Sequence, residues 1–262
     1  MEIPGIPQSK PFAVLVDCDG TLIDSVSVPQ KIIRGLCTRY RIPFHESAFR
    51  RHWGRGTLSM FLEYFFAGPI TQASVTLDDL AAQFEALYQR TGYHPPLIPH
   101  AEQALRAVRA SGIISCLVTN RTAAHLTPDV PCATLTELFD VVQTYFSCYE
   151  TENATPAASK KLFAVFPKPD PRALWPVLHY LDTHYGVPLQ HITLIGDSLG
   201  DAGAAAEFVR EYNMHFGGVC TGSINSARTW QKELRTLRMP LRNCRVLRSL
   251  GELKPEMIYK NP

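Results

Sequence analysis

Residues 12–25 of the chain are Phe-Ala-Val-Leu-Val-Asp-Cys-Asp-Gly-Thr-Leu-Ile-Asp-Ser, a stretch in which five consecutive apolar residues lead into two carboxylates and a glycine. An apolar run without alternation indicates a strand buried on both faces, as in the centre of a parallel sheet, and ligands gather at the carboxyl ends of such strands. Because side chains of an extended segment alternate, Asp17 and Asp19 should face one space while Cys18 points away. Gly20 then allows a sharp turn.

Two neighbouring carboxylates are costly unless a cation or a shared proton relieves their repulsion. Asp17 and Asp19 therefore predict a metal site, an acid/base pair, or both, and the plain alternative is an ordinary Asp-Gly turn. The longer string Asp-x-Asp-Gly-Thr-Leu-x-Asp-Ser is more specific. It resembles the first motif of the haloacid dehalogenase superfamily of aspartate-nucleophile phosphatases. This resemblance implies that three further motifs follow in order.

The composition is that of an ordinary globular protein. With 262 residues, 45% of them hydrophobic, the chain can bury a full core, either as one large domain or as a domain with an inserted one. The net charge of +2 and the absence of a long basic run give no reason to expect a nucleic-acid partner. No segment approaches the ~18 apolar residues of a membrane span, and seven widely spaced cysteines indicate neither a disulfide framework nor a zinc site. We therefore expect a soluble, cytoplasmic protein without membrane association.

Residues 26–92 change to a helical pattern without a strong strand signal. After a first helix that begins near Val28, further helices fit residues 46–52, 56–67 and 77–91. Three prolines within five residues then form a stiff linker before the alternation of strands and helices resumes. The sequence thus predicts an α/β core made of residues 1–24 and 95–262, and an inserted all-helical cap made of residues 25–94.

The second and third motifs lie in the C-terminal part of this core. The apolar strand expected at residues 113–118 ends in Thr119 and Asn120, which resembles the second motif, although a threonine at a strand end is often only a turn residue. The run Lys168-Pro-Asp-Pro precedes a helix and resembles the third motif. Lys160 and Lys161 are rivals of Lys168, but neither precedes the Pro-x-Pro that favours a helix start. Residues 144–167 read as an insertion of unknown role with a polar surface loop.

The fourth motif follows another apolar strand, expected at residues 191–195. The sequence Gly-Asp-Ser-Leu-Gly-Asp at residues 196–201 resembles it and adds two carboxylates, those of Asp197 and Asp201. A plain alternative for Asp201 is an acid in the first turn of a helix, where it complements the helix dipole.

The resemblance implies a Rossmann-like, doubly wound parallel sheet and a phosphatase that hydrolyses a small phosphorylated metabolite, similar to phosphoglycolate phosphatases. In the family's mechanism Asp17 attacks phosphorus and forms an aspartyl-phosphate, while Asp19 moves the protons. Lys168 neutralises charge, and the hydroxyl of the second-motif threonine and the backbone after it bind phosphoryl oxygens. Mg²⁺ would be held by Asp17, Asp197 and the backbone carbonyl of Asp19, with Asp201 supporting these ligands.

Substrate contacts are expected from both parts of the chain. Gly20 and Asn120 are the candidates in the core. In the cap, Arg55 is flanked by glycines and would suit an anionic leaving group, whereas Arg50 and Arg51 fit a solvated helix face equally well.

Other functions on this fold remain open alternatives. A β-phosphoglucomutase-like enzyme usually has a histidine where Pro29 stands, and a phosphonatase needs a cap lysine, for which only Lys31 is available. A dehalogenase lacks the second aspartate, present here as Asp19. The alternative that is not an enzyme is a binding or regulatory member of the family without catalytic activity. The chain could act as a monomer or a homodimer.

Overall fold

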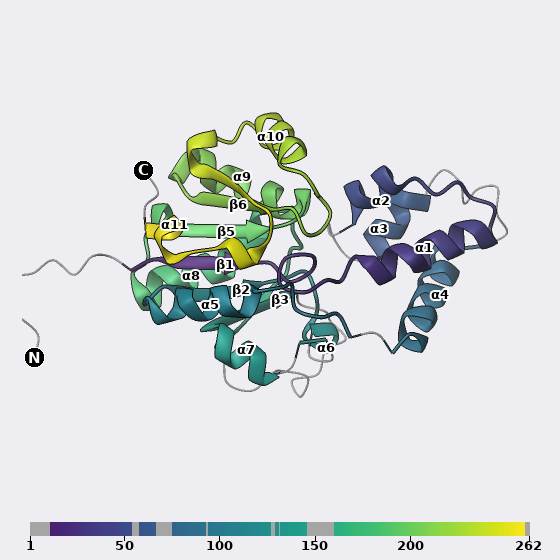
Figure 1. Ribbon diagram of the computed structural model, residues 1–262, viewed down its shortest axis with the longest axis horizontal. Coiled ribbons are helices and arrows are strands. Elements are labelled where there is room, and N and C mark those ends of the chain that lie inside the picture. Colours follow the sequence, from purple (N-terminus) through teal and green to yellow (C-terminus); the bar gives the residue numbers. More distant parts are fainter. Residues whose placement is uncertain are drawn as a thin grey trace, which may run out of the picture.

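The computed structural model describes residues 11–53, 58–66, 75–92, 94–126, 129–130, 132–145 and 160–259. Within these ranges the strands form a parallel seven-stranded sheet of order β4-β3-β2-β1-β5-β6-β7 (Figure 1). The strands are β1 (Ala13–Val16), β2 (Ile114–Val118), β3 (Val141–Tyr145), β4 (Lys160–Ala164), β5 (Ile192–Gly196), β6 (His215–Val219) and β7 (Cys244–Leu247). Because the chain winds outward from β1 in both directions, the expected doubly wound α/β fold is confirmed.

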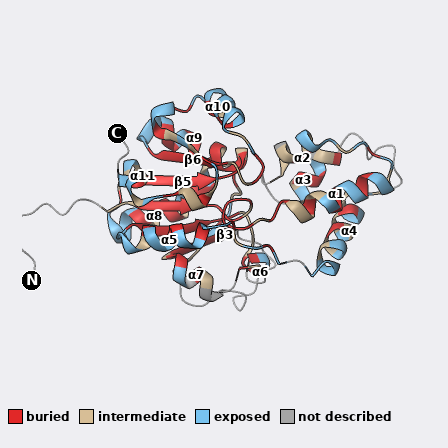
Figure 2. Cartoon of the chain, viewed as in Figure 1, coloured by how far each residue is buried: buried red, intermediate tan, exposed pale blue. Residues whose placement is uncertain are grey.

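Helices cover both faces of this sheet, and alternate residues of β1 belong to different cores. Ala13 and Leu15 pack on one face with helices α8, α9 and α10, whereas Val14 and Val16 pack on the other face with α5, α7 and α11. Figure 2 shows the strands as buried segments between helices whose outer surfaces are exposed. The helices are α5 (Ala101–Ala110), α6 (Ala123–Leu126), α7 (Cys132–Leu138), α8 (Trp175–Tyr185), α9 (Leu199–Tyr212), α10 (Ala227–Thr236) and α11 (Pro255–Tyr259).

The central position of β1 explains its unbroken apolar sequence. Leu15 lies opposite Cys116 of β2 on one side and Leu194 of β5 on the other, and no residue of β1 is accessible to solvent. Parallel strands in this register end at the same edge of the sheet. The Asp17 amide accordingly donates to the Ile195 carbonyl at 2.9 Å, which fixes the start of the first motif beside the end of β5.

The segment between β1 and β2 forms a separate helical unit beyond the carboxyl ends of the strands (Figure 1). Its helices are α1 (Ser27–Arg39), α2 (Glu46–His52), α3 (Leu58–Phe66) and α4 (Leu77–Arg90). They enclose their own core around Phe49, and α4 starts with a capping box between Thr76 and Asp79. The two connections to the sheet run side by side, since the Asp24 amide donates to the Pro96 carbonyl at 2.9 Å. We call this unit the cap; its division from the core at residues 25–94 stays a prediction.

The expectation of an insertion at residues 144–167 was wrong at both ends. β3 continues to Tyr145, and β4 pairs with β3 in parallel as an edge strand of the sheet. The sequence hides β4 because it begins with two lysines, and an edge strand can keep charged residues that a central strand could not. The interpretation of the polar segment at 151–161 as a surface loop was wrong at its end, because Lys160 and Lys161 lie in β4; residues 151–159 lie outside the described residues.

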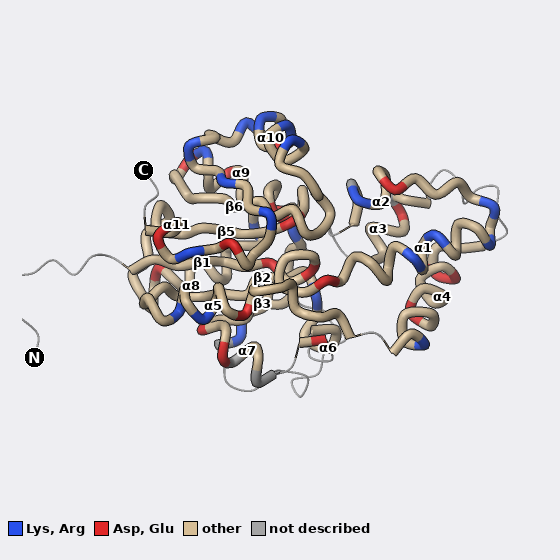
Figure 3. The backbone as a smooth tube through the Cα atoms, viewed as in Figure 1, with Lys and Arg blue, Asp and Glu red and all other residues tan. Residues whose placement is uncertain are grey.

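Charged residues of both signs lie along the helices of both units, and blue positions are most frequent around α10 (Figure 3). Among the described residues, no helix is long and apolar enough to cross a membrane.

Candidate active site

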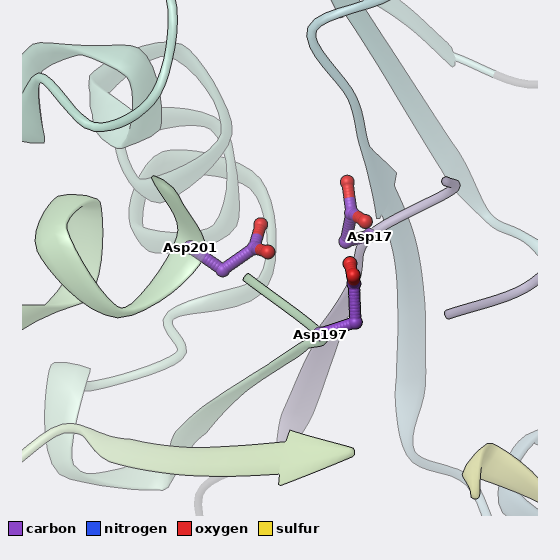
Figure 4. Close-up of side chains that lie close together, drawn as sticks. All are labelled: Asp17, Asp197 and Asp201. Atoms are coloured by element: carbon purple, nitrogen blue, oxygen red, sulfur yellow. The ribbon is translucent and has the colours of Figure 1, made fainter. Parts of the chain in front are cut away.

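Three buried carboxylates meet at the carboxyl edge of the sheet. Asp17 follows β1, Asp197 follows β5, and Asp201 lies in the first turn of α9; one oxygen from each lies within 4.8 Å of the others (Figure 4). Their exposed fractions are 6%, 2% and 1%. The parallel register that aligns the ends of β1 and β5 therefore brings the first and fourth motifs together, although 180 residues separate Asp17 from Asp197 in the sequence.

Lys168 is the cation of this group. Its buried ammonium donates to Oδ1 of Asp17 and to Oδ1 of Asp201, each at 2.6 Å, and to the Val118 carbonyl at 2.9 Å. The Asn120 side chain holds the lysine backbone in two directions, because it accepts from the Lys168 amide at 2.8 Å and donates to the Lys168 carbonyl at 3.0 Å. The rivals Lys160 and Lys161 lie on the edge strand β4. The fold thus brings Lys168, the lysine of the third motif, to Asp17.

Asp201 is held by contacts that use both of its oxygens. Oδ1 accepts from Lys168, and Oδ2 accepts from the Ser198 hydroxyl at 2.6 Å and from the Ser198 amide at 3.2 Å. The contacts with Ser198 form a capping box that fixes the start of α9. Asp201 is therefore both an acid in the first turn of a helix and a partner of Lys168. A supporting role of Asp201 in a metal site stays a prediction.

One lysine does not balance three buried carboxylates. Burial raises the pKa of Asp17 well above its ordinary value, the charge of Asp201 raises it further, and Lys168 offsets only part of this increase. Burial and the charge of Asp201 likewise raise the pKa of Asp197 to about 7. A divalent cation would relieve this repulsion, and buried carboxylate oxygens are hard ligands that suit Mg²⁺. The residues present therefore fit a magnesium site.

These pKa shifts predict how the stability of the metal-free protein depends on pH. An Asp197 pKa raised from 3.8 to about 7 means that the folded state binds a proton that the unfolded chain has released between these values. The free energy of unfolding contributed by this group is therefore greatest at low pH and decreases as the pH rises toward about 7. We expect urea titrations in chelator, between about pH 5 and pH 8, to show this decrease.

Asp197→Asn is the control for this prediction, because its slope of stability against pH should be shallower than that of the wild type. The comparison of slopes is needed since burial lowers the pKa of His215, which acts in the opposite sense. Equal slopes for both proteins would contradict the raised pKa of Asp197.

Asp19 carries an ion pair that the sequence did not reveal. Arg121 donates from Nε to Oδ2 and from Nη2 to Oδ1 of Asp19, both at 2.7 Å. The guanidinium is itself held by the Asp129 carboxylate and by the His125 carbonyl. Burial raises the pKa of Asp19, but the charge and hydrogen bonds of Arg121 outweigh this effect and lower it overall. The signal available in the sequence was the position of Arg121 directly after Thr119 and Asn120, at the end of a core strand.

Gly20 has a structural reason to be glycine. Its φ is +76°, and a Cβ there would lie 2.7 Å from Oδ2 of Asp197. The Gly20 amide donates to the Ile23 carbonyl at 2.8 Å, and its carbonyl accepts from the Thr221 hydroxyl at 2.5 Å. These contacts close the turn after β1 against Asp197, and a contact between Gly20 and substrate stays a prediction.

Thr119 is buried, and its hydroxyl accepts from the Arg121 amide at 3.1 Å. This contact fixes the backbone after β2, and a contact of the hydroxyl with phosphate stays a prediction.

The described residues of the cap and the core enclose a cleft of about 720 Å³. Asp17 and Asp19 both line it, whereas Cys18 packs in the core beneath. The cleft is also lined from the core by Asn120, Arg121, Lys168 and Asp197, and from the cap by Pro29, Trp53, Phe61, Phe84, Glu85 and Tyr88.

Of the three cap arginines expected near the substrate, only Arg50 has a described side chain. Arg50 donates to Glu46 and to the Gly222 carbonyl, each at 3.1 Å, so it joins the cap to the core. The side chain of Arg51 and the whole of Arg55 lie outside the described residues, and any contact they make with substrate stays a prediction.

Comparisons with known proteins agree with this geometry. Residues 13–208 match the family described as haloacid dehalogenase-like hydrolase. The phosphoglycolate phosphatase of Pseudomonas putida is 30% identical over 206 residues, which are 76% of this chain and 67% of that protein. The phosphoglycolate phosphatase of Nitrosospira multiformis is 27% identical over 199 residues, 74% of this chain and 78% of that protein.

A solved structure supports the fold. The crystal structure of a haloacid dehalogenase family hydrolase from Deinococcus radiodurans R1, with bound phosphate and sodium, superposes with a TM-score of 0.63. It is 20% identical and covers 96% of this chain and 97% of its own. Two findings define the class of the present protein. Its parallel sheet of seven strands carries an acidic group at the carboxyl edge, and the family match covers residues 13–208. The protein belongs to the haloacid dehalogenase-like hydrolases.

Proposed function

We propose that this chain is a Mg²⁺-dependent phosphatase that hydrolyses a phosphorylated metabolite through an aspartyl-phosphate on Asp17. The observation that carries this proposal is the position of Asp17 on the floor of the cleft, with Oδ1 held by Lys168 and with Asp197 beside it. The two relatives named phosphoglycolate phosphatase support the same reaction class. Uncatalysed hydrolysis of phosphate monoesters is extremely slow, so a positioned nucleophile and concentrated positive charge are what the reaction needs.

The chemistry of the first step follows from the contacts around Asp17. The oxygen of Asp17 attacks phosphorus, the bond from phosphorus to the alcohol oxygen breaks, and Lys168 neutralises charge shared by the carboxylate and the phosphoryl group. The Thr119 hydroxyl and the backbone amide of Asn120 are candidates to donate to phosphoryl oxygens. When bound by Asp17 and Asp197, together with the Asp19 carbonyl, Mg²⁺ would supply charge neutralisation between the nucleophile and the phosphate.

Asp19 lines the same cleft and is the candidate for proton transfer. It would donate a proton to the departing alcohol, for which the carboxyl group must be protonated against the pKa-lowering effect of Arg121, and then take one from the water that hydrolyses the aspartyl-phosphate. Its two roles require the carboxyl group to lie on the cleft side of Asp17, so its orientation matters as much as its presence.

A direct test of the phosphatase proposal is release of inorganic phosphate from a generic aryl phosphate, with and without Mg²⁺. We expect turnover that depends on the metal. Absence of hydrolysis for this ester and for a panel of phosphorylated metabolites would leave the idle binding or regulatory alternative.

Arg121 should act as a positioning residue for Asp19. Arg121→Gln removes the two hydrogen bonds that hold the Asp19 carboxyl, and misplacing a proton donor costs up to roughly 100-fold in rate. We expect kcat/KM to fall strongly for alkyl phosphates, whose leaving alcohols need a proton, and much less for aryl phosphates, which leave readily. Steady-state kinetics on both ester classes measure this difference.

Arg172→Gln is a matched control, because Arg172 makes a similar forked pair with Asp170 on the exposed surface. It should change neither ester class. If Arg121→Gln damages alkyl and aryl phosphates equally, the arginine only stabilises the fold and the positioning role is lost. Arg121→Lys should recover part of the activity on alkyl phosphates.

The other enzymatic alternatives have less support. Pro29, which lines the cleft, stands in the region where a phosphoglucomutase-like enzyme would carry a histidine. Lys31, the only lysine of the cap, is exposed on α1 and is not one of the residues that line the cleft. We propose that residues 25–94 act as a specificity domain over a core that carries the chemistry.

A further inference from the structure

The cap side of the cleft includes four aromatic rings, those of Trp53, Phe61, Phe84 and Tyr88, which we call the aromatic wall. The ring of Trp53 meets that of Phe61 edge-on, with centroids 5.1 Å apart, and lies 6.2 Å from that of Phe84. Phe84 in turn stacks on Tyr88, with centroids 6.0 Å apart and an interplanar angle of 13°. The four rings are therefore in contact with one another; Phe61 and Phe84 are buried in the core of the cap, and the half-buried Trp53 and Tyr88 present the wall to the cleft.

Contacts with the core fix this wall opposite the catalytic carboxylates. The Trp53 carbonyl accepts from the Ser223 hydroxyl at 2.9 Å, and the amide of the same serine donates to Oδ2 of Asp197 at 2.5 Å. At the other end, Tyr88 lines the cleft together with Arg121 and with Asp129, which pairs with that arginine. A leaving group bound to phosphorus at Asp17 would therefore extend toward the rings.

The charges that the described residues place in the cleft disfavour an acidic leaving group; Arg55 lies outside these residues. Lys168 already serves Asp17 and Asp201, and Arg121 already serves Asp19 and Asp129. In the described part of the cleft, every lysine and arginine is thus paired with carboxylates, while Glu85 adds a negative charge on the cap side. A carboxylate on the leaving group would meet repulsion there, whereas an uncharged ring would gain aromatic contacts.

The size of the cleft points in the same direction. A volume of about 720 Å³ lies within the range of pockets that enclose drug-sized ligands, roughly 300 to 1,000 Å³. An acid as small as glycolate would leave most of the aromatic wall without a contact.

We propose that the aromatic wall binds the leaving group, and that the substrate is a phosphomonoester whose alcohol carries an uncharged aromatic or heteroaromatic ring, as in a nucleoside monophosphate. This inference rests on the proposed phosphatase function. In the net reaction the bond from phosphorus to the alcohol oxygen breaks. Water supplies the new oxygen on phosphorus and a proton for the alcohol. The products are the ring-bearing alcohol and inorganic phosphate.

Benzyl phosphate and ethyl phosphate provide a matched test, because both are esters of primary alcohols and only one carries a ring. We expect kcat/KM for benzyl phosphate to exceed that for ethyl phosphate by roughly 10- to 100-fold, since the ring is desolvated against the wall. Phosphoglycolate, with its carboxylate, should also be a poorer substrate than benzyl phosphate.

Trp53→Leu should reduce the benzyl-to-ethyl preference by roughly tenfold, because leucine keeps an apolar side chain but removes the ring face. Trp175→Leu is the control, since it makes the same substitution at an exposed tryptophan at the start of α8. It should leave the preference unchanged. If Trp53→Leu does not fold, Tyr88→Leu tests the other exposed end of the wall.

The outcomes separate the two proposals. Phosphate release with equal kcat/KM for both esters, or with a preference for phosphoglycolate, overturns the aromatic leaving group and leaves the phosphatase function intact. If Arg55→Ala then abolishes the preference for phosphoglycolate, this arginine and not the aromatic wall sets specificity. Failure to hydrolyse any ester, including an aryl phosphate, overturns the phosphatase function and this inference with it.

Discussion

Asp17→Asn should lower turnover by roughly 10⁴-fold or more, because the amide has the shape of the carboxylate but cannot attack phosphorus. The fold should survive the change. Lys168 keeps its contact with Asp201, and the substitution removes one of three buried carboxylates that repel one another. We therefore expect the free energy of unfolding without metal to change little.

The measurement combines steady-state kinetics with trapping of the intermediate. Wild-type enzyme quenched in acid during turnover should carry a phosphoryl group that hydroxylamine removes, and the Asp17→Asn protein should carry none. Asp170→Asn is the control, since this aspartate pairs with Arg172 away from the cleft. Hydrolysis by Asp17→Asn at more than a few per cent of the wild-type rate would falsify the aspartyl-phosphate mechanism, once mass spectrometry has excluded deamidation back to aspartate.

Removal of divalent metal should lower activity by roughly 10³-fold or more, and Mg²⁺ should restore it. The physical reason is the excess of buried negative charge at Asp17, Asp197 and Asp201, which a phosphate dianion would increase further. Ca²⁺ should not replace Mg²⁺. Calcium accepts more oxygen ligands, so it favours engagement of both carboxylate oxygens of Asp17 and would compete with the hydrogen bond from Lys168.

A metal titration after chelation tests this expectation, and thermal unfolding gives a readout that does not depend on activity. Mg²⁺ should raise the melting temperature of the wild type, and Asp197→Asn should weaken this effect and require a higher Mg²⁺ concentration for half-maximal activity. Full activity in excess chelator, or equal activity with Ca²⁺, would remove the proposed metal role of these aspartates.

Much of the fold was legible in the sequence because its signals are local. The apolar run at residues 12–16 predicted the central strand, since a strand covered on both faces has no position for a polar side chain. The helical pattern of the cap and the capped start at Thr76 also follow from the spacing of neighbouring residues. In contrast, β4 was missed, because this edge strand lacks the unbroken apolar sequence that marks a buried strand.

The sequence by itself therefore determined the class of fold and the order of the four motifs. Asp17, Asp19 and Asp197 were candidates because they follow apolar strands whose ends share one edge of a parallel sheet, and Lys168 was a candidate because it precedes the Pro-x-Pro of a helix start. Only the tertiary structure decided which groups meet. It brought Lys168 to Asp17 across 151 positions of sequence and Arg121 to Asp19 across 102. It also placed the aromatic rings of the cap opposite the carboxylates. Such contacts depend on the packing of distant segments, and no local periodicity in the sequence encodes them.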